Sequence, residues 1–164
     1  MRFPLPLRHV LCLSLSAALY APMVAAGPTA APFHATISFA EQVFAGPSTT
    51  SPCMFQSAVV GEGVASATGA VTASSHDCIN PASATATLFV ATDLVLKSAS
   101  GDEIHGQYAG ILSAGYITGG YTISGGTGRF KHASGYGTLQ GTETFDFDTL
   151  SGTGLLQLKG SISY

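Results

Sequence analysis

The chain has 164 residues, of which 46% are hydrophobic, 9% charged and 9% aromatic, with 20 glycines and no tryptophan. Its net charge of −3 gives no basic surface for phosphate groups, which argues against nucleic acid as a partner. Lys and Glu are scarce whereas Ser, Thr, Ala and Gly are abundant. This composition disfavours a mostly helical fold and favours β-strands.

Residues 1–26 have the pattern of a secretory signal peptide. Arg2 and Arg8 precede an apolar run at residues 10–21, and a Val-Ala-Ala triplet at the end of the segment provides a small-residue cleavage site. A membrane anchor is the alternative, but the apolar run is far shorter than the roughly 20 residues that a spanning helix needs, and Pro22 ends it. The sequence therefore predicts export to the periplasm or the medium.

Cleavage after this segment leaves two cysteines, Cys53 and Cys78, because Cys12 is removed with the signal. In an oxidising compartment such a pair usually forms a disulfide, and no Cys-x-x-Cys spacing supports a metal or redox site. Residues 27–32, rich in Pro, Gly and Ala, are expected to form a flexible mature N-terminus, and residues 33–164 a single domain.

Two-residue alternation of apolar and polar side chains recurs through this domain. In residues 33–40, for example, Phe, Ala and Ile alternate with polar or small residues, which is typical of a strand with one buried face. The predicted strands are 33–40, 54–60, 64–72, 84–97, 103–112, 115–124, 137–148 and 154–164. The segments 46–53 and 74–83 are predicted as loops that the disulfide ties together.

The short connections between successive strands favour antiparallel pairing of neighbours. Because eight strands can close on themselves and leave no edge, we predict an all-β fold, a single eight-stranded antiparallel up-and-down β-barrel. A two-sheet β-sandwich has the same strand pattern and stays open as the alternative.

Residues 124–137, SGGTGRFKHASGYG, combine a GGTG segment with an aromatic residue, small residues and further glycine. This stretch resembles the signature of the allene oxide cyclase and dirigent barrel group. The likeness covers about residues 33–164 and is closest to small secreted bacterial members, whose last strand ends much as GSISY does here.

The resemblance implies a calycin-like barrel with a cavity. Plant members of the group guide cyclisation or radical coupling without a metal or organic cofactor, so it also implies a cofactor-free activity of that class. Plant members form dimers or trimers, which leaves a homo-oligomer open. The catalytic residues of the plant members do not map onto this chain.

The GGTG segment is expected to have a structural role. Gly125, Gly126 and Gly128 permit backbone conformations or close approaches that other residues do not, and Phe130 can plug one end of the barrel. A phosphate-binding loop is the competing interpretation, but no Lys-Ser or Lys-Thr pair follows the glycines.

Alternation places one carboxyl group among apolar side chains. In the strand 137–148, Glu143 shares a face with Leu139, Phe145 and Phe147, so we expect it to point into the barrel. Burial there would raise the pKa of Glu143 and allow it to exchange protons with an apolar substrate. The alternative is a shifted register that turns Glu143 outward, or a carboxyl group held by ordinary hydrogen bonds.

The same reasoning turns Tyr108 and Tyr121 inward, within reach of Glu143, and places Tyr164 inside the barrel. Five predicted inward positions are glycines, Gly106, Gly110, Gly119, Gly141 and Gly160. These glycines leave room for a ligand, or else they mark bulges and corners where strands bend.

The sequence offers little support for metal binding or for nucleophilic catalysis. His34, His76, His105 and His132 lack the spacing of metal ligands, and no Gly-x-Ser-x-Gly elbow occurs, so neither a metal nor a cofactor is expected.

Several function classes stay open. The first is a secreted barrel that binds a small apolar molecule, with or without cyclase or isomerase activity supported by Glu143, Tyr108 and Tyr121. The second is a non-catalytic surface or interaction module. A small outer-membrane barrel is the third, disfavoured by outward faces rich in Ser and Thr and by the lack of Trp for aromatic girdles.

Overall fold

The computed structural model of the chain describes residues 29–44 and 53–164. In this part the strands are β1 (Ala31–Phe44), β2 (Phe55–Ala65), β3 (Gly69–Ser83), β4 (Ala86–Ser98), β5 (Glu103–Ser113), β6 (Tyr116–Gly126), β7 (Ser134–Asp146) and β8 (Ser151–Ser163), with the 3-10 turn η1 (Gly128–Phe130) between β6 and β7. No helix within these residues is long and apolar enough to cross a bilayer. The predicted signal segment, residues 1–26, lies outside the described residues.

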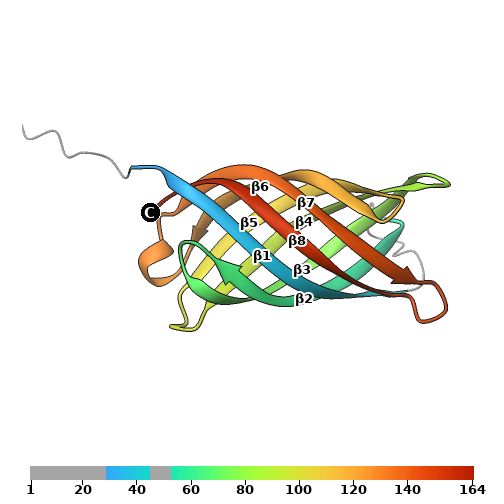
Figure 1. Ribbon diagram of the computed structural model, residues 1–164, viewed down its shortest axis with the longest axis horizontal. Helices are drawn as coiled ribbons and strands as arrows, with labels where there is room; N and C mark the ends of the chain where they lie inside the picture. Colours follow the sequence, from blue (N-terminus) through green and yellow to red (C-terminus); the bar gives the residue numbers. More distant parts are fainter. Residues whose placement is uncertain (1–28, 45–52) are drawn as a thin grey trace, which may run out of the picture.

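Each strand pairs antiparallel with the next in sequence, and β8 pairs with β1, so the sheet closes into a barrel (Figure 1). The predicted eight-stranded up-and-down barrel is confirmed. The sandwich alternative is wrong because hydrogen bonding continues around the whole ring, so the sheet has no free edges to divide it in two.

The core lies inside the barrel. In β1, Phe33, Ala35 and Ile37 are buried and alternate with exposed residues, as the period of two requires. The end of the barrel next to η1 is closed by Phe130, which is fully buried. The chain reaches Phe130 through Gly125 and Gly128, which have positive φ angles of 151° and 54°.

The segment 74–83, predicted as a loop, instead forms most of β3. Its alternation was hidden because the inward positions carry the polar residues Ser75 and Asp77, which are buried, while Ser74 and His76 face outward. The period of two is present in this strand, but its buried face is not apolar.

Two aromatic residues predicted to face inward do not. Phe147 is 82% exposed because β7 ends at Asp146, so the alternation stops before residue 147. Tyr164 follows the end of β8, is 48% exposed and packs edge-on against Phe130 with ring centroids 4.8 Å apart. Both side chains lie where the strand pattern no longer applies.

The predicted disulfide between Cys53 and Cys78 is present. Cys53 lies just before β2, whereas Cys78 lies within β3 and not on a loop as predicted. Gln56 of β2 pairs with Cys78, so the disulfide joins the start of the β2–β3 hairpin to its second strand. It thus fixes the segment of β3 that carries Asp77.

Candidate functional site

A cavity of about 80 Å³ occupies the half of the barrel remote from η1. It has room for several water molecules, since about 10–15 Å³ suffices for one. Most of its lining is apolar, including Phe39, Phe89, Leu112, Leu139 and Leu156. The lining also includes polar residues, among them Glu41, Ser75, Asp77, Tyr108 and Glu143.

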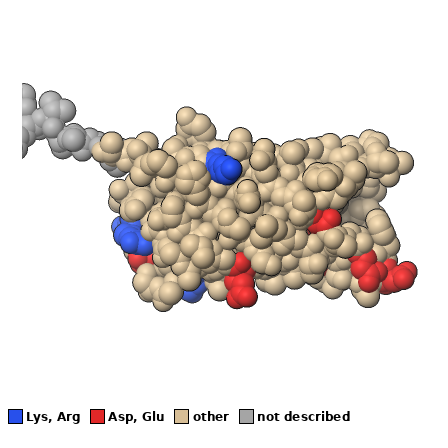
Figure 2. Space-filling view, in the orientation of Figure 1, with Lys and Arg blue, Asp and Glu red and all other residues tan. Residues whose placement is uncertain are grey.

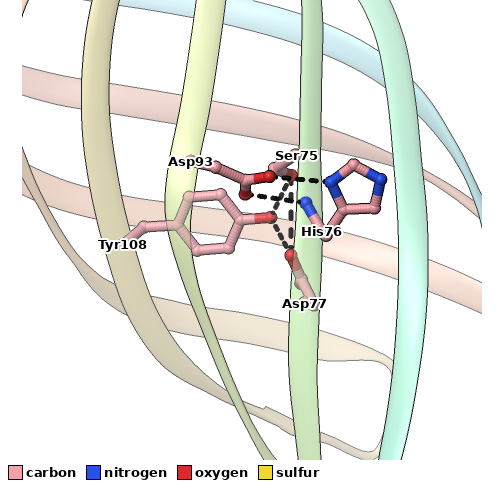
Figure 3. A network of polar contacts seen from close by, with 5 residues as sticks. All are labelled: Ser75, His76, Asp77, Asp93 and Tyr108. Atoms are coloured by element: carbon pink, nitrogen blue, oxygen red, sulfur yellow. Dashed lines mark hydrogen bonds and ion pairs between the residues drawn. The ribbon is translucent and has the colours of Figure 1, made fainter.

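The first polar group of the cavity joins β3 to β5 (Figure 3). Tyr108 donates a hydrogen bond of 2.5 Å to Asp77 Oδ1, and its Oη lies 2.7 Å from Ser75 Oγ. All three side chains are at least nine-tenths buried. Asp77 is therefore a buried carboxyl group whose partners are neutral hydroxyl groups.

A bulge in β4 holds residues 75–77 of β3 in place. Two β4 residues, Thr92 and Asp93, lie opposite Gln107 of β5, and the pairing of β3 with β4 is interrupted beside them. Asp93 accepts a 2.9 Å hydrogen bond from the backbone N–H of His76, and its other oxygen lies 2.7 Å from His76 Nδ1 (Figure 3). The carboxylate replaces the missing ladder partner, so the residues flanking His76 stay turned into the barrel.

These contacts set the protonation of the β3 site. Burial raises the pKa of Asp77 to about 6, and the negative charges of Glu41 and Asp93 add to the rise, while hydrogen bonds from Tyr108 and Ser75 oppose it. Burial and the adjacent carboxylate raise the pKa of Tyr108 well above its usual value. Near neutral pH Tyr108 therefore stays protonated and donates to a largely ionised Asp77.

A pair of carboxyl groups, Glu41 of β1 and Glu143 of β7, forms the second polar group. Burial raises the pKa of Glu143 to about 8, and the hydrogen bond and negative charge of Glu41 act in the same direction. Glu143 Oε1 is buried and has no hydrogen-bond partner among the described residues. Near neutral pH Glu143 is therefore mainly protonated.

The structure brings two of the three predicted site residues to the cavity and places the third outside it. Glu143 and Tyr108 both line the cavity, but Tyr108 bonds to Asp77 and not to Glu143. Tyr121 is absent from the lining of this cavity; its ring packs against Phe33 in the filled half, with centroids 6.0 Å apart. Its hydroxyl has no partner among the described residues, and burial raises the pKa of Tyr121 to about 12.

Sequence reasoning missed Glu41 and Asp77. The alternation from Phe33 through Phe39 continues to Glu41, so extending the first strand by one more pair of residues would have placed this carboxyl group inside. For Asp77, the neighbouring residues Ser75 and His76 are polar, so the sequence showed no apolar face. Its burial and its hydrogen bond with Tyr108 establish that it points into the barrel.

A metal centre has no support in the described ranges, where no three His, Cys, Asp or Glu side chains are grouped closely enough to hold an ion.

The fold can be compared with proteins of known structure. The pterocarpan synthase dirigent protein GePTS1 matches over 85% of this chain and 88% of its own, with a TM-score of 0.50 and 14% sequence identity. No family model matches the chain, and no curated protein matches its sequence. The fold is therefore a dirigent-like eight-stranded barrel, and one half of this barrel contains a cavity.

Proposed function

We propose that this protein is a secreted dirigent-like barrel that binds a small apolar molecule in its cavity. The observation that carries the proposal is the difference between the two halves of the barrel. Phe33, Phe130 and Tyr121 fill one half, whereas the other keeps a cavity with apolar walls and a few polar groups. Binding sites for small molecules have this combination of shape and chemistry.

The polar groups suit proton exchange with the bound molecule. Glu143, mainly protonated near neutral pH, can donate a proton, and Asp77, largely ionised, can accept one. Such a pair supports cofactor-free isomerisation or cyclisation, the class of activity that the resemblance to the allene oxide cyclase and dirigent group implies. The likeness in fold to a dirigent protein named as a synthase agrees with a small-molecule role.

Native mass spectrometry tests the binding proposal. The mature protein, purified from medium or periplasm without detergent, is expected to carry or take up one small apolar molecule, for example benzyl alcohol from an added library. The variant Ala73→Leu places extra atoms in the cavity wall and should abolish uptake. Ala70→Leu, on the exposed face of the same strand, is the matched control.

If the wild type takes up no compound, and both variants fold and give the same result, the binding proposal is contradicted. The alternative of a non-catalytic surface module would then be the better account. The same spectra test export, because a mature chain that begins at Gly27 has the mass expected after removal of residues 1–26. The disulfide agrees with an oxidising compartment.

A further inference from the structure

The lining of the cavity includes acidic side chains but no basic ones. Glu41, Asp77 and Glu143 come from three different strands, β1, β3 and β7, and the lining includes no Lys, Arg or His. The negative charge of Glu41 raises the pKa of both Asp77 and Glu143, and the charge of Asp77 raises that of Glu143 as well. Among the described residues that line the cavity, no cation balances the negative potential of these carboxyl groups.

Glu143 has one carboxyl oxygen that could accept a hydrogen bond from a ligand. Its Oε1 atom is buried yet lacks a hydrogen-bond partner among the described residues. The chain contributes other carboxyl groups near it, Glu41 from β1 and Asp77 from β3, together with the protonated phenol of Tyr108 from β5. A buried carboxyl oxygen left in this state is stabilised by a ligand that brings a hydrogen-bond donor, and most strongly by a charged one.

Charge is also divided along the barrel axis. Lys97 and Arg129 lie toward the η1 end, where they pair with Glu103 and Asp102 at 3.3 Å and 3.7 Å. At the cavity end the β7–β8 connection carries exposed acidic residues, Asp146 and Asp148. Figure 2 shows this division on one face, with basic side chains only in the half that contains η1. A cation approaching the cavity end meets a favourable field.

The rest of the lining suits an apolar body. Phe39 of β1 and Phe89 of β4 both line the cavity. Aromatic faces bind hydrocarbon surface and also attract cations. The site is therefore suited to a ligand that has both an apolar body and a positive charge.

We propose that the ligand class of this cavity is a small amphipathic amine, an alkyl or aryl group carrying a protonated nitrogen that donates to Glu143. This proposal rests on the proposed function, since it names the kind of molecule that the cavity binds. The ammonium group supplies the donor that Glu143 Oε1 lacks and balances the charge of the surrounding carboxyl groups.

A matched pair of probes tests the proposal. Benzylammonium and benzyl alcohol have nearly the same shape but differ in charge, so their dissociation constants can be compared by protein-observed NMR titration at one pH. Benzylammonium is expected to bind at least about tenfold more tightly. The variants Glu143→Gln and Glu41→Gln should reduce this difference, whereas Glu62→Gln, on the exposed face of β2, should preserve it.

The pH dependence gives a second readout on the wild-type chain. Affinity for benzylammonium should rise as pH increases from about 6 to about 8, because Glu143 and Asp77 become ionised over this range. Affinity for benzyl alcohol should not rise.

Equal binding of both probes would overturn the amine proposal and leave the proposed function standing. Binding of neither probe, together with no uptake of other apolar compounds, would overturn both. The comparison of probes on the wild-type chain remains decisive if a glutamine variant fails to fold.

Discussion

Glu143 meets Glu41 across β8, a strand that places no side chain between them. Glu41 pairs with Gly152 and Glu143 pairs with Gly154, and both glycines belong to the inward face of β8. A Cβ atom on Gly152 would lie 2.0 Å from Glu143 Oε1. The two bare positions on β8 thus allow carboxyl groups from non-neighbouring strands to interact.

Gly152→Ala should separate the carboxyl pair while preserving the fold. The added methyl group meets the end of the flexible Glu143 side chain, so we expect a change in unfolding free energy of no more than about 1 kcal/mol. The pKa of Glu143 should fall, which carboxyl ¹³C NMR can measure.

Gly154→Ala is the comparison variant. It should lower the unfolding free energy by more, about 1–3 kcal/mol, because its Cβ would lie 2.1 Å from the backbone oxygen of Thr142. An unchanged pKa in a folded Gly152→Ala variant would show that the pair does not depend on the gap.

Glu143 should make the protein less stable as pH rises. Its pKa in the fold is raised to about 8 from an ordinary value of 4.5, so the folded state holds a proton that the unfolded state releases between these values. Stability should fall over this window by up to about 1.4 kcal/mol per pH unit for this group. Urea unfolding between about pH 6 and about pH 8 separates its effect from that of Asp77, whose pKa is about 6. Glu143→Gln should flatten the slope there and Glu62→Gln should not; equal slopes in all three proteins would contradict the raised pKa.

Removing the Tyr108 hydroxyl should destabilise the fold by about 1–3 kcal/mol, because Asp77 and Ser75 lose a buried partner. The pKa of Asp77 should rise further in Tyr108→Phe, since the hydrogen bond from Tyr108 lowers it. Chemical unfolding and carboxyl NMR measure the two effects. Tyr116→Phe, at an exposed position, serves as the control, and comparable losses in the two variants would refute the buried network.

The Cys53–Cys78 disulfide closes a segment with a sequence separation of 25. Replacing both cysteines by serine should lower the unfolding free energy by up to about 3.5 kcal/mol, because the unfolded chain gains the freedom of this loop. Comparing urea midpoints of the wild type and the double variant measures the loss. Reducing agent should shift the wild type in the same direction and leave the variant unchanged; a shift of both would point to another cause.

Phe130→Ala should cost about 3–5 kcal/mol, since this fully buried ring closes the η1 end of the barrel. Tyr164→Ala removes a half-exposed ring that packs on the same residue and should cost much less. Thermal unfolding of the two variants checks the order. A similar loss in both would mean that the terminal tyrosine is as much a part of the plug as Phe130.

Local periodicity was sufficient for much of this architecture. The alternation in segments such as residues 33–40 and the short connections predicted eight antiparallel strands, and the barrel confirms their number and pairing. The predicted strand 64–72 is wrong, because residues 66–68 form the turn between β2 and β3. The same period placed Glu143 and Tyr108 on inward faces, because side-chain direction in a strand follows from position alone. It failed where the buried face is polar, at Ser75 and Asp77, because the pattern relies on hydrophobic contrast.

The sequence by itself determined the strand count, the disulfide pair and the direction of Glu143, since each depends on nearest-neighbour geometry or on composition. Only the tertiary structure decided which polar groups share a cavity. Tyr108 reaches Asp77 and not Glu143 because a bulge in β4 fixes the β3 segment. Glu41 reaches Glu143 because closure of the barrel brings β1 and β7 to opposite sides of a glycine-lined β8. Both relationships depend on ring closure and on register between distant strands, which no local pattern encodes.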